Sequence, residues 1–166
     1  MPDLKPKKSG FTLIEILVSM TIIGFLFSFG YASFRDFSRR QALAGVVKQV
    51  QGDLRLAQQK ALSGEKPSGC TTLPVKTLNG YNFYRSAENV YIIQADCSGL
   101  AAAVPVKSVI LPSGIKISAP SPNPIKFKAL GQGTNIVSGE SATITITQDA
   151  VSNSQDVIVT AGGEIK

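Results

Sequence analysis

The chain has 166 residues and a formal charge of +6, with 17 lysines and arginines against 11 aspartates and glutamates. It contains no histidine, its two cysteines form no C-x-x-C pair, and it carries neither a G-x-S-x-G elbow nor a Walker-type phosphate loop. These features argue against an enzyme and against a cysteine–histidine metal centre, so we expect no catalysis, no cofactor and no metal.

The first predicted element is an apolar helix over residues 11–34. It follows a basic leader, residues 1–10, that carries Lys5, Lys7 and Lys8. The helix is close to the roughly 20 apolar residues that span a bilayer, and the lysines place the leader on the cytoplasmic side by the positive-inside rule. We therefore predict a single transmembrane helix, with the rest of the chain outside the cytoplasm.

Glu15 is the one charged residue in this apolar stretch. An ionised side chain inside hydrocarbon is costly, so a carboxylate at this position is a candidate functional group that needs a cationic partner. The alternative is that Glu15 only reaches the interface near the end of the helix, as polar side chains can.

A removable secretory signal is an alternative interpretation of the segment, with Gly30-Tyr31-Ala32 as its cleavage site. The apolar region of such a signal has roughly 7–15 residues, whereas the stretch from Phe11 to Phe34 is much longer. Helical periodicity also continues beyond it without a break. These features favour a helix that is retained.

The residues Ser9-Gly10-Phe11-Thr12-Leu13-Ile14-Glu15, with the apolar helix that follows them, resemble the class III signal of type IV prepilins and pseudopilins. The resemblance implies that a prepilin peptidase cuts between Gly10 and Phe11 and methylates the new amino terminus of Phe11. It also implies that Glu15 neutralises the terminal ammonium of a neighbouring subunit. The partners implied are other pilin or pseudopilin subunits, the prepilin peptidase, and the bacterial inner membrane with its assembly platform.

The physical chemistry of the segment agrees with this assignment. Removal of the leader creates an ammonium on Phe11, about one helical turn from Glu15, and both charges lie in or beside hydrocarbon. Because each subunit carries the two opposite charges at different heights, pairing between staggered subunits would set the axial step of a helical filament.

Residues 35–63 are predicted to continue the helix with an amphipathic pattern. The apolar positions recur at steps of four and three, which places them on one stripe that packs on a domain core. These positions are Leu43, Val47, Val50, Leu54, Ala57 and Ala61. The polar residues Lys48, Gln51, Asp53, Arg55, Gln58 and Gln59 are expected mostly on the other faces. Stop signals at Ser63-Gly64 and Pro67 end the helix near Leu62.

Residues 64–166 are predicted to form one small antiparallel β domain, in one or two sheets, that covers the amphipathic half of the helix. The fold class is therefore α+β: a long transmembrane-plus-amphipathic helix packed on a β domain, as in the pilin fold. The expected strands are Tyr81–Arg85, Val90–Ala95, Val106–Leu111, Ile115–Ser118, Ile125–Ala129, Ala142–Thr147 and Asp156–Thr160.

The cysteines Cys70 and Cys97 both lie in the part predicted to be outside the cytoplasm. An even pair in an oxidising compartment indicates a disulfide, worth about 3–4 kcal/mol on the chain-entropy model. Two buried free thiols are the alternative. The acids Asp96, Glu140, Asp149, Asp156 and Glu164 could in principle bind calcium, but isolated acids in loops are usually only solvated.

The resemblance extends, less specifically, to Tyr81–Tyr84, Val90–Ile93, Ile125–Gly131 and Val157–Gly163, which look similar to the H-type minor pseudopilins of type II secretion and to minor type IV pilins. Major pilins commonly close a disulfide loop near the C-terminus, whereas the cysteines here lie mid-chain. The family implies a non-catalytic subunit in the inner membrane, with a periplasmic C-terminal domain, that enters an extracytoplasmic filament at its initiation or tip.

DNA binding for uptake in natural transformation is an alternative function, because some of these relatives bind DNA. Lys107, Lys116, Lys126 and Lys128 could gather on the sheet as a phosphate-binding patch. The DNA-binding relatives are expected to carry arginine in a basic C-terminal stretch, and Thr160–Lys166 contains none. A membrane-tethered β domain that never polymerises is the other alternative.

Overall fold

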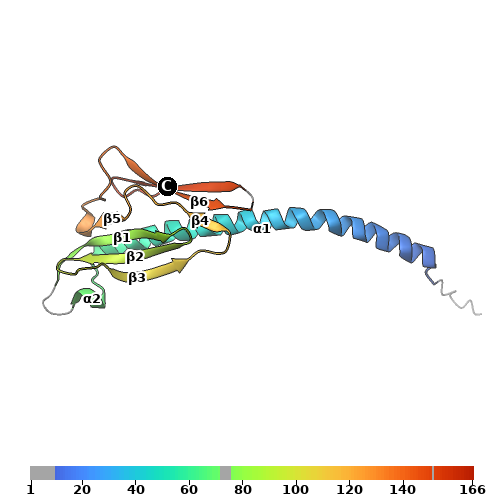
Figure 1. Ribbon diagram of the computed structural model, residues 1–166, viewed down its shortest axis with the longest axis horizontal. Coiled ribbons are helices and arrows are strands. Elements are labelled where there is room, and N and C mark those ends of the chain that lie inside the picture. The colour runs from blue at the N-terminus through green and yellow to red at the C-terminus, as the bar shows by residue number, and fades with distance from the viewer. Residues whose placement is uncertain (1–9, 72–75, 151) are drawn as a thin grey trace, which may run out of the picture. The chain divides into compact units, whose positions relative to one another are not determined.

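The computed structural model of the chain describes residues 10–71, 76–150 and 152–166, with the side chains of 28–33 left out. The chain divides into two compact units, Met1–Ser38 and Arg39–Lys166. The elements in chain order are α1 (Leu13–Ser63), α2 (Ser68–Thr71), β1 (Leu78–Ala87), β2 (Val90–Cys97), β3 (Val104–Ile110), β4 (Ile115–Ile117), β5 (Ile125–Lys128), the 3-10 turn η1 (Ala129–Gly131), β6 (Ser141–Gln148) and β7 (Asn153–Thr160) (Figure 1). The predicted leader, apart from Gly10, lies outside the described residues.

The first unit contains the apolar beginning of α1. Its large apolar side chains from Phe11 to Phe27 are exposed, with Phe11 and Leu13 at 79% and 82%. Among the described residues, no helix is long and apolar enough to cross a membrane. The predicted span, residues 11–34, includes the side chains of 28–33, which lie outside the described part.

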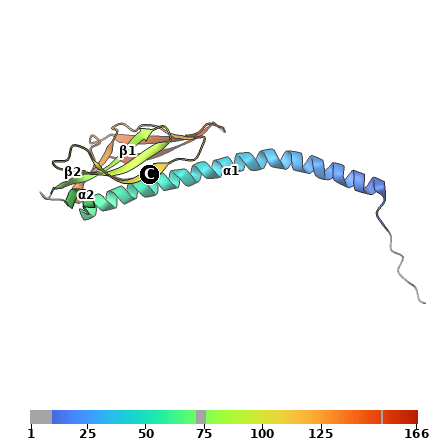
Figure 2. The same cartoon turned by 60° about the horizontal axis from the view of Figure 1, so that its bottom comes forward.

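In the second unit, α1 packs through the predicted stripe. All six stripe positions are buried, and Val46 is buried beside them. The β domain lies along one side of this part of the helix (Figure 2). The expected amphipathic packing is therefore confirmed. One expectation was wrong: Asp53 is 5% exposed and faces the domain interior, because strand residues supply polar partners there.

The larger sheet has four antiparallel strands in the order β3-β2-β1-β5. Tyr91, Ile93 and Ala95 of β2 are buried and alternate with partly exposed residues, which is the period of a strand with one covered face. The rings of Phe83 and Tyr91 stack with centroids 5.1 Å apart. This buried face packs on α1, because the Tyr91 hydroxyl reaches Asp53 of the helix.

The smaller sheet has three antiparallel strands in the order β4-β6-β7. Along β6, Ala142, Ile144 and Ile146 are buried while Ser141 and Thr143 are exposed, so the predicted alternation is confirmed. All seven predicted strands are present, and most differ from their expected bounds only at the ends. The four-residue helix α2 was not predicted, since one turn carries no periodic pattern.

Thr134 joins the two sheets into one domain. It forms an isolated antiparallel β-bridge with Phe127 of β5. Its backbone N–H donates to the carbonyl of Ala161, just after β7, over 3.1 Å. Its hydroxyl donates to the same carbonyl oxygen over 2.9 Å. The two buried faces therefore share one core, which suits a chain too short for two.

A disulfide links Cys70 of α2 to Cys97 of β2, with Cα atoms 6.0 Å apart. The bridge is buried and confirms the pairing expected from the cysteine count. Nearby, the Tyr81 hydroxyl donates to the backbone carbonyl of Glu65 over 2.7 Å. Together these contacts fasten the segment that follows α1 to the larger sheet.

Candidate processing and assembly site

The segment that resembles a prepilin signal enters α1 through Thr12, which has the geometry of an N-cap. The Thr12 carbonyl accepts the N–H groups of Glu15 at 3.1 Å and of Ile16 at 3.3 Å. Its side-chain Oγ1 also accepts the Glu15 N–H at 3.3 Å. A hydroxyl that bonds the N–H three residues ahead satisfies one of the donors left free at the start of a helix.

Sequence reasoning missed this role, although a signal for it was present. Thr12 and Glu15 have the spacing of a capping box, in which a threonine is followed three residues later by a glutamate. Thr12 is therefore an additional residue of the candidate site.

The Gly10–Phe11 peptide bond lies before the helix and is open to solvent. Neither residue is helical, and both are exposed, Phe11 by 79%. No heavy atom lies within 4 Å of the position that a Cβ on Gly10 would occupy. Exposed non-helical backbone of this kind is where proteases act, so the arrangement suits cleavage at this bond.

Glu15 occupies the first turn of α1 and is exposed. A carboxylate near the N-terminal end of a helix is stabilised by the helix dipole. Its separation of four residues from Phe11 places the two residues about one turn apart if the helix extends to the amino terminus. The carboxylate is therefore accessible to a cation from another molecule.

The four lysines proposed for DNA contact do not form one patch. Lys107 lies on the helix-facing side of the larger sheet, where its Nζ is 2.6 Å from Asp53 Oδ1. Lys126 and Lys128 alternate with the buried residues of β5 and so lie on its other face. Lys116 belongs to the smaller sheet. The expectation of a gathered patch was wrong. The strand order and the strand faces, which the sequence does not show, place the four lysines on two faces of the larger sheet and on a second sheet.

Carboxylates pair with three of these four lysines. Lys107 pairs with Asp53, Lys126 with Asp96, and Lys116 with Asp149 at 3.1 Å and Glu88 at 3.7 Å. The hydrogen bond to Asp149 raises the pKa of Lys116. Within the part of the chain that the structure covers, no group of three acids or cysteines could hold a metal ion.

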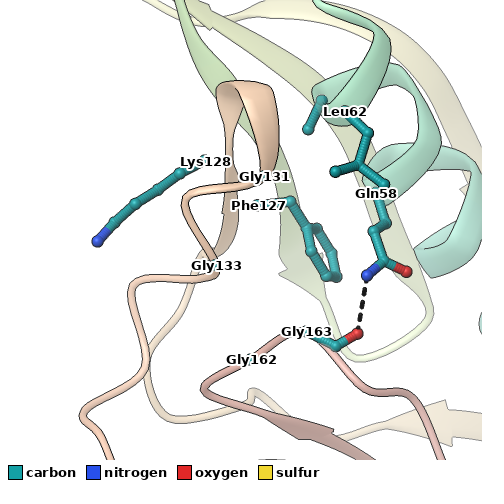
Figure 3. A pocket seen from close by; sticks show the side chains of 9 residues that line it. Gln58, Leu62, Phe127, Lys128, Gly131, Gly133, Gly162 and Gly163 are labelled. Carbon is teal, nitrogen blue, oxygen red and sulfur yellow. Dashed lines mark hydrogen bonds between the residues drawn. The ribbon is translucent and has the colours of Figure 1, made fainter.

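A small cavity of about 60 Å³ lies at the end of α1, beside the C-terminal turn (Figure 3). The Gln58 side-chain N–H donates to the Gly163 carbonyl over 3.1 Å across it. Four glycines, Ala61, Leu62 and the ring of Phe127 also line it, and the side chain of Lys128 points away from it. Its polar lining is one amide and bare backbone, which suits packing of the helix end and offers no acid, base or nucleophile.

Comparison with known proteins bears on the N-terminal segment. The family described as "Prokaryotic N-terminal methylation motif" matches residues 5–31. No curated protein and no solved structure matches the chain. The matched segment contains the Gly10–Phe11 bond, the Thr12 cap and Glu15. The motif supports a type IV pilin-like structural subunit that interacts with other pilins and with a prepilin peptidase.

Proposed function

We propose that the chain is a non-catalytic minor pilin or pseudopilin subunit. It is cleaved after Gly10, methylated on Phe11, and assembled into a type IV pilus or a type II secretion pseudopilus. The observation that carries the proposal is the exposed Gly10–Phe11 bond directly before a capped helix whose first turn presents Glu15, all inside the matched motif.

The apolar segment anchors the subunit in the bacterial inner membrane. Its large apolar side chains up to Phe27 are exposed, and such a surface needs a lipid or protein environment. The β domain lies in the periplasm and becomes extracytoplasmic in the filament. The Cys70–Cys97 disulfide supports this placement, because disulfides persist in oxidising compartments.

Assembly uses the two opposite charges near the start of α1. Hydrolysis frees an ammonium on Phe11, and Glu15 of another subunit neutralises it as the helices pack side by side. In an apolar environment each unpaired charge is costly, so pairing favours the assembled state. The mid-chain disulfide favours a minor subunit that acts at initiation or at the tip.

Mass spectrometry of the mature amino terminus tests the processing step. The full-length chain is produced in membranes with an active prepilin peptidase, and an inactive peptidase serves as the control. We expect N-methyl-Phe11 only with the active enzyme. An intact Met1 or a new terminus at Ser33 would refute the proposal.

Variants of Glu15 test the assembly step. Glu15→Gln keeps the size and polarity of the side chain and removes its charge, whereas Glu15→Asp keeps the charge. We expect Gln to be processed normally and to be depleted from sheared filaments, and Asp to be retained in them. Equal incorporation of the Gln variant into filaments would show that assembly does not use the charge of Glu15. Absence of the wild-type chain itself from sheared filaments would favour a tether that does not polymerise.

DNA uptake is the alternative function, and the lysine geometry does not favour it. Among the described residues, Lys128 is the only one of the four predicted contacts without an ion pair to a carboxylate. We expect the full-length chain in micelles not to retard double-stranded DNA at physiological salt. If the wild-type chain retards DNA and Lys128→Glu does not, DNA uptake would be favoured over the proposed function.

A further inference from the structure

The side of α1 that faces away from the β domain carries a second regular row of residues. The β domain lies along one side of this part of the helix (Figure 2). The residues of the row recur at steps of four and three, so they share one face of the helix, and all of them are exposed. This row, called the outer seam, consists of Gln41, Gly45, Lys48, Gly52, Arg55 and Gln59.

The two cations of the outer seam are uncompensated. Lys48 and Arg55 are seven residues apart, which is close to two helical turns, so they lie on the same side of α1. Among the described residues, neither forms an ion pair with a carboxylate. The one acid between Arg39 and Ser63 is Asp53, and it is buried against the β domain. The charge of the seam is therefore positive.

Gly45 and Gly52 leave room for a close approach beside these cations. Apart from neighbouring residues and the local helix backbone, no heavy atom lies within 4 Å of the position that a Cβ on either glycine would occupy. The packing of the chain itself therefore does not require glycine there, and glycine is a poor helix former. Glycine does allow the backbones of two packed helices to come close together.

We propose that the outer seam binds an α-helix of a different pilin-like subunit, one that carries two carboxylates with the spacing of Lys48 and Arg55. The inference rests on the proposed assembly, in which subunit helices pack side by side. Carboxylates at this spacing lie on one face of the partner helix, because both helices have the same pitch. The row continues at Leu62, which is 51% exposed and contacts an apolar residue of the same partner.

The charge of the seam also selects against a second copy of this chain. Two copies paired along this stretch would bring Lys48 and Arg55 beside the same cations of the other copy, and Asp53 is buried in both. Like charges across an interface disfavour a partner. The seam therefore favours contact between unlike subunits.

Charge reversal in the full-length chain tests the role of the two cations. The variant Lys48→Glu with Arg55→Glu is produced in the host that supplies the other filament subunits, and its amount in sheared filaments is compared with that of the wild-type chain. Single exposed ion pairs are weak, but reversal replaces two attractions by two repulsions, so we expect the amount to fall by about tenfold. Unchanged incorporation would overturn the inference.

The matched control is Lys66→Glu with Lys128→Glu, which makes the same change in net charge at two exposed lysines outside the seam. We expect this variant to enter filaments at the wild-type level. Both double variants should keep the wild-type unfolding midpoint, because all the replaced side chains are exposed. A fall in incorporation equal to that of the seam variant would assign the effect to net charge and would overturn the inference.

Gly52→Leu separates docking from folding. Leucine is a better helix former than glycine and meets open space at this position, so the isolated chain should be at least as stable as wild type. Incorporation into filaments should nevertheless fall by about fivefold, because the leucine side chain blocks the approach of the partner helix. Incorporation at the wild-type level would show that no helix packs on the seam.

A photo-crosslinker in the seam identifies the partner. Gln59, which lies between Arg55 and Leu62, is replaced by benzoylphenylalanine, and assembled filaments are irradiated. We expect an adduct with a helix of a different pilin-like subunit that has two acids at the stated spacing. Replacing those acids by lysine should restore incorporation of Lys48→Glu with Arg55→Glu. An adduct only with a second copy, with lipid or with DNA would overturn the inference, as would failure of the exchanged charges to restore incorporation.

The proposed function and this inference fail in different ways. If the wild-type chain is present in sheared filaments and the seam variant enters them equally well, the inference is wrong and the proposed assembly stands. If the wild-type chain is itself absent from filaments, the proposed function is wrong and the inference falls with it.

Discussion

The carboxylate of Asp53 and the hydroxyl of Tyr91 meet inside the interface between α1 and the larger sheet, where the hydroxyl donates to Oδ2 over 2.8 Å. The other carboxylate oxygen accepts a hydrogen bond from Lys107 Nζ at 2.6 Å. A buried carboxylate is costly unless it is hydrogen-bonded and paired. One carboxylate oxygen accepts from a residue of β2 and the other from a residue of β3. Asp53 therefore links α1 to both strands.

Lys107→Met should destabilise the β domain by about 1–2 kcal/mol, because it leaves the Asp53 carboxylate without its cation while keeping the packing of the side-chain stem. The expected loss is below that of a fully buried pair, since 41% of the Lys107 side chain is exposed and water can reach it. The measurement is denaturant-induced unfolding of the full-length chain in micelles, followed by circular dichroism.

Lys128→Met is the control for the loss of a lysine, because its side chain is exposed on β5 and its removal should change the unfolding free energy by less than about 0.5 kcal/mol. Adding Asp53→Leu to Lys107→Met should recover part of the loss, since no unpaired charge remains buried. Additive losses in this double-mutant cycle would contradict the pairing.

Alkaline pH should weaken the fold through Tyr91. Burial, together with the hydrogen bond to Asp53, raises the pKa of the Tyr91 hydroxyl above its usual range. Because the folded pKa lies above the unfolded value, this stabilisation is fully present below about pH 10 and is lost as pH rises toward the folded pKa. Burial raises the pKa of Tyr81 as well, and the hydrogen bond to Glu65 raises the pKa of Lys60, so both groups act in the same direction.

Unfolding free energies of wild type and Tyr91→Phe, measured from pH 8 to pH 12, check this expectation. The variant should be less stable at pH 8, because it leaves one oxygen of Asp53 without a donor. The gap should narrow above about pH 10, where the unfolded wild-type chain gains by ionising Tyr91. Tyr84→Phe, on the other face of β1, is the control, and a gap that is independent of pH would contradict the assignment.

Much of the fold follows from local patterns in the sequence. The stripe from Leu43 to Ala61 and the alternation in β6 report directly which face of each element is buried. The burial of Asp53 could not be predicted in this way. Its partners lie 38 and 54 residues further along the chain, so its environment exists only once the strand order and register are known.

The residues of the candidate site also differ in whether local sequence patterns could predict them. Gly10, Phe11 and Glu15 could be predicted because they belong to one dense local motif, and the capping role of Thr12 could have been predicted from the spacing of Thr12 and Glu15 in that motif. The lysine patch required knowledge of which sheet and which face carry each residue. Lys107 and Lys126 both lie in strands of the larger sheet, yet on opposite faces.

Replacing both Cys70 and Cys97 by alanine should lower the unfolding free energy by about 3–4 kcal/mol, because the bridge closes a loop in the unfolded chain. The two residues are 27 positions apart. Wild type with and without reductant provides the matched comparison, and reduction should reproduce most of the loss. If the double alanine variant unfolds at the same midpoint as the oxidised wild type, a stabilising role for the bridge is refuted.

Replacing Gly80 or Gly52 by alanine should change the unfolding free energy in opposite directions. A Cβ on Gly80 would overlap the backbone carbonyl of Phe127 in the neighbouring strand, and forcing such overlap costs about 1–3 kcal/mol. Gly52 is exposed in α1 with no atom within 4 Å of its Cβ position, so alanine there should stabilise the helix by up to about 1 kcal/mol. Unfolding midpoints of the two single variants give the test.

A gain in stability for Gly80→Ala would mean that β5 lies further from β1 than the pairing of Gly80 with Lys128 requires. A loss of stability for Gly52→Ala would mean that another molecule packs on that side of the helix.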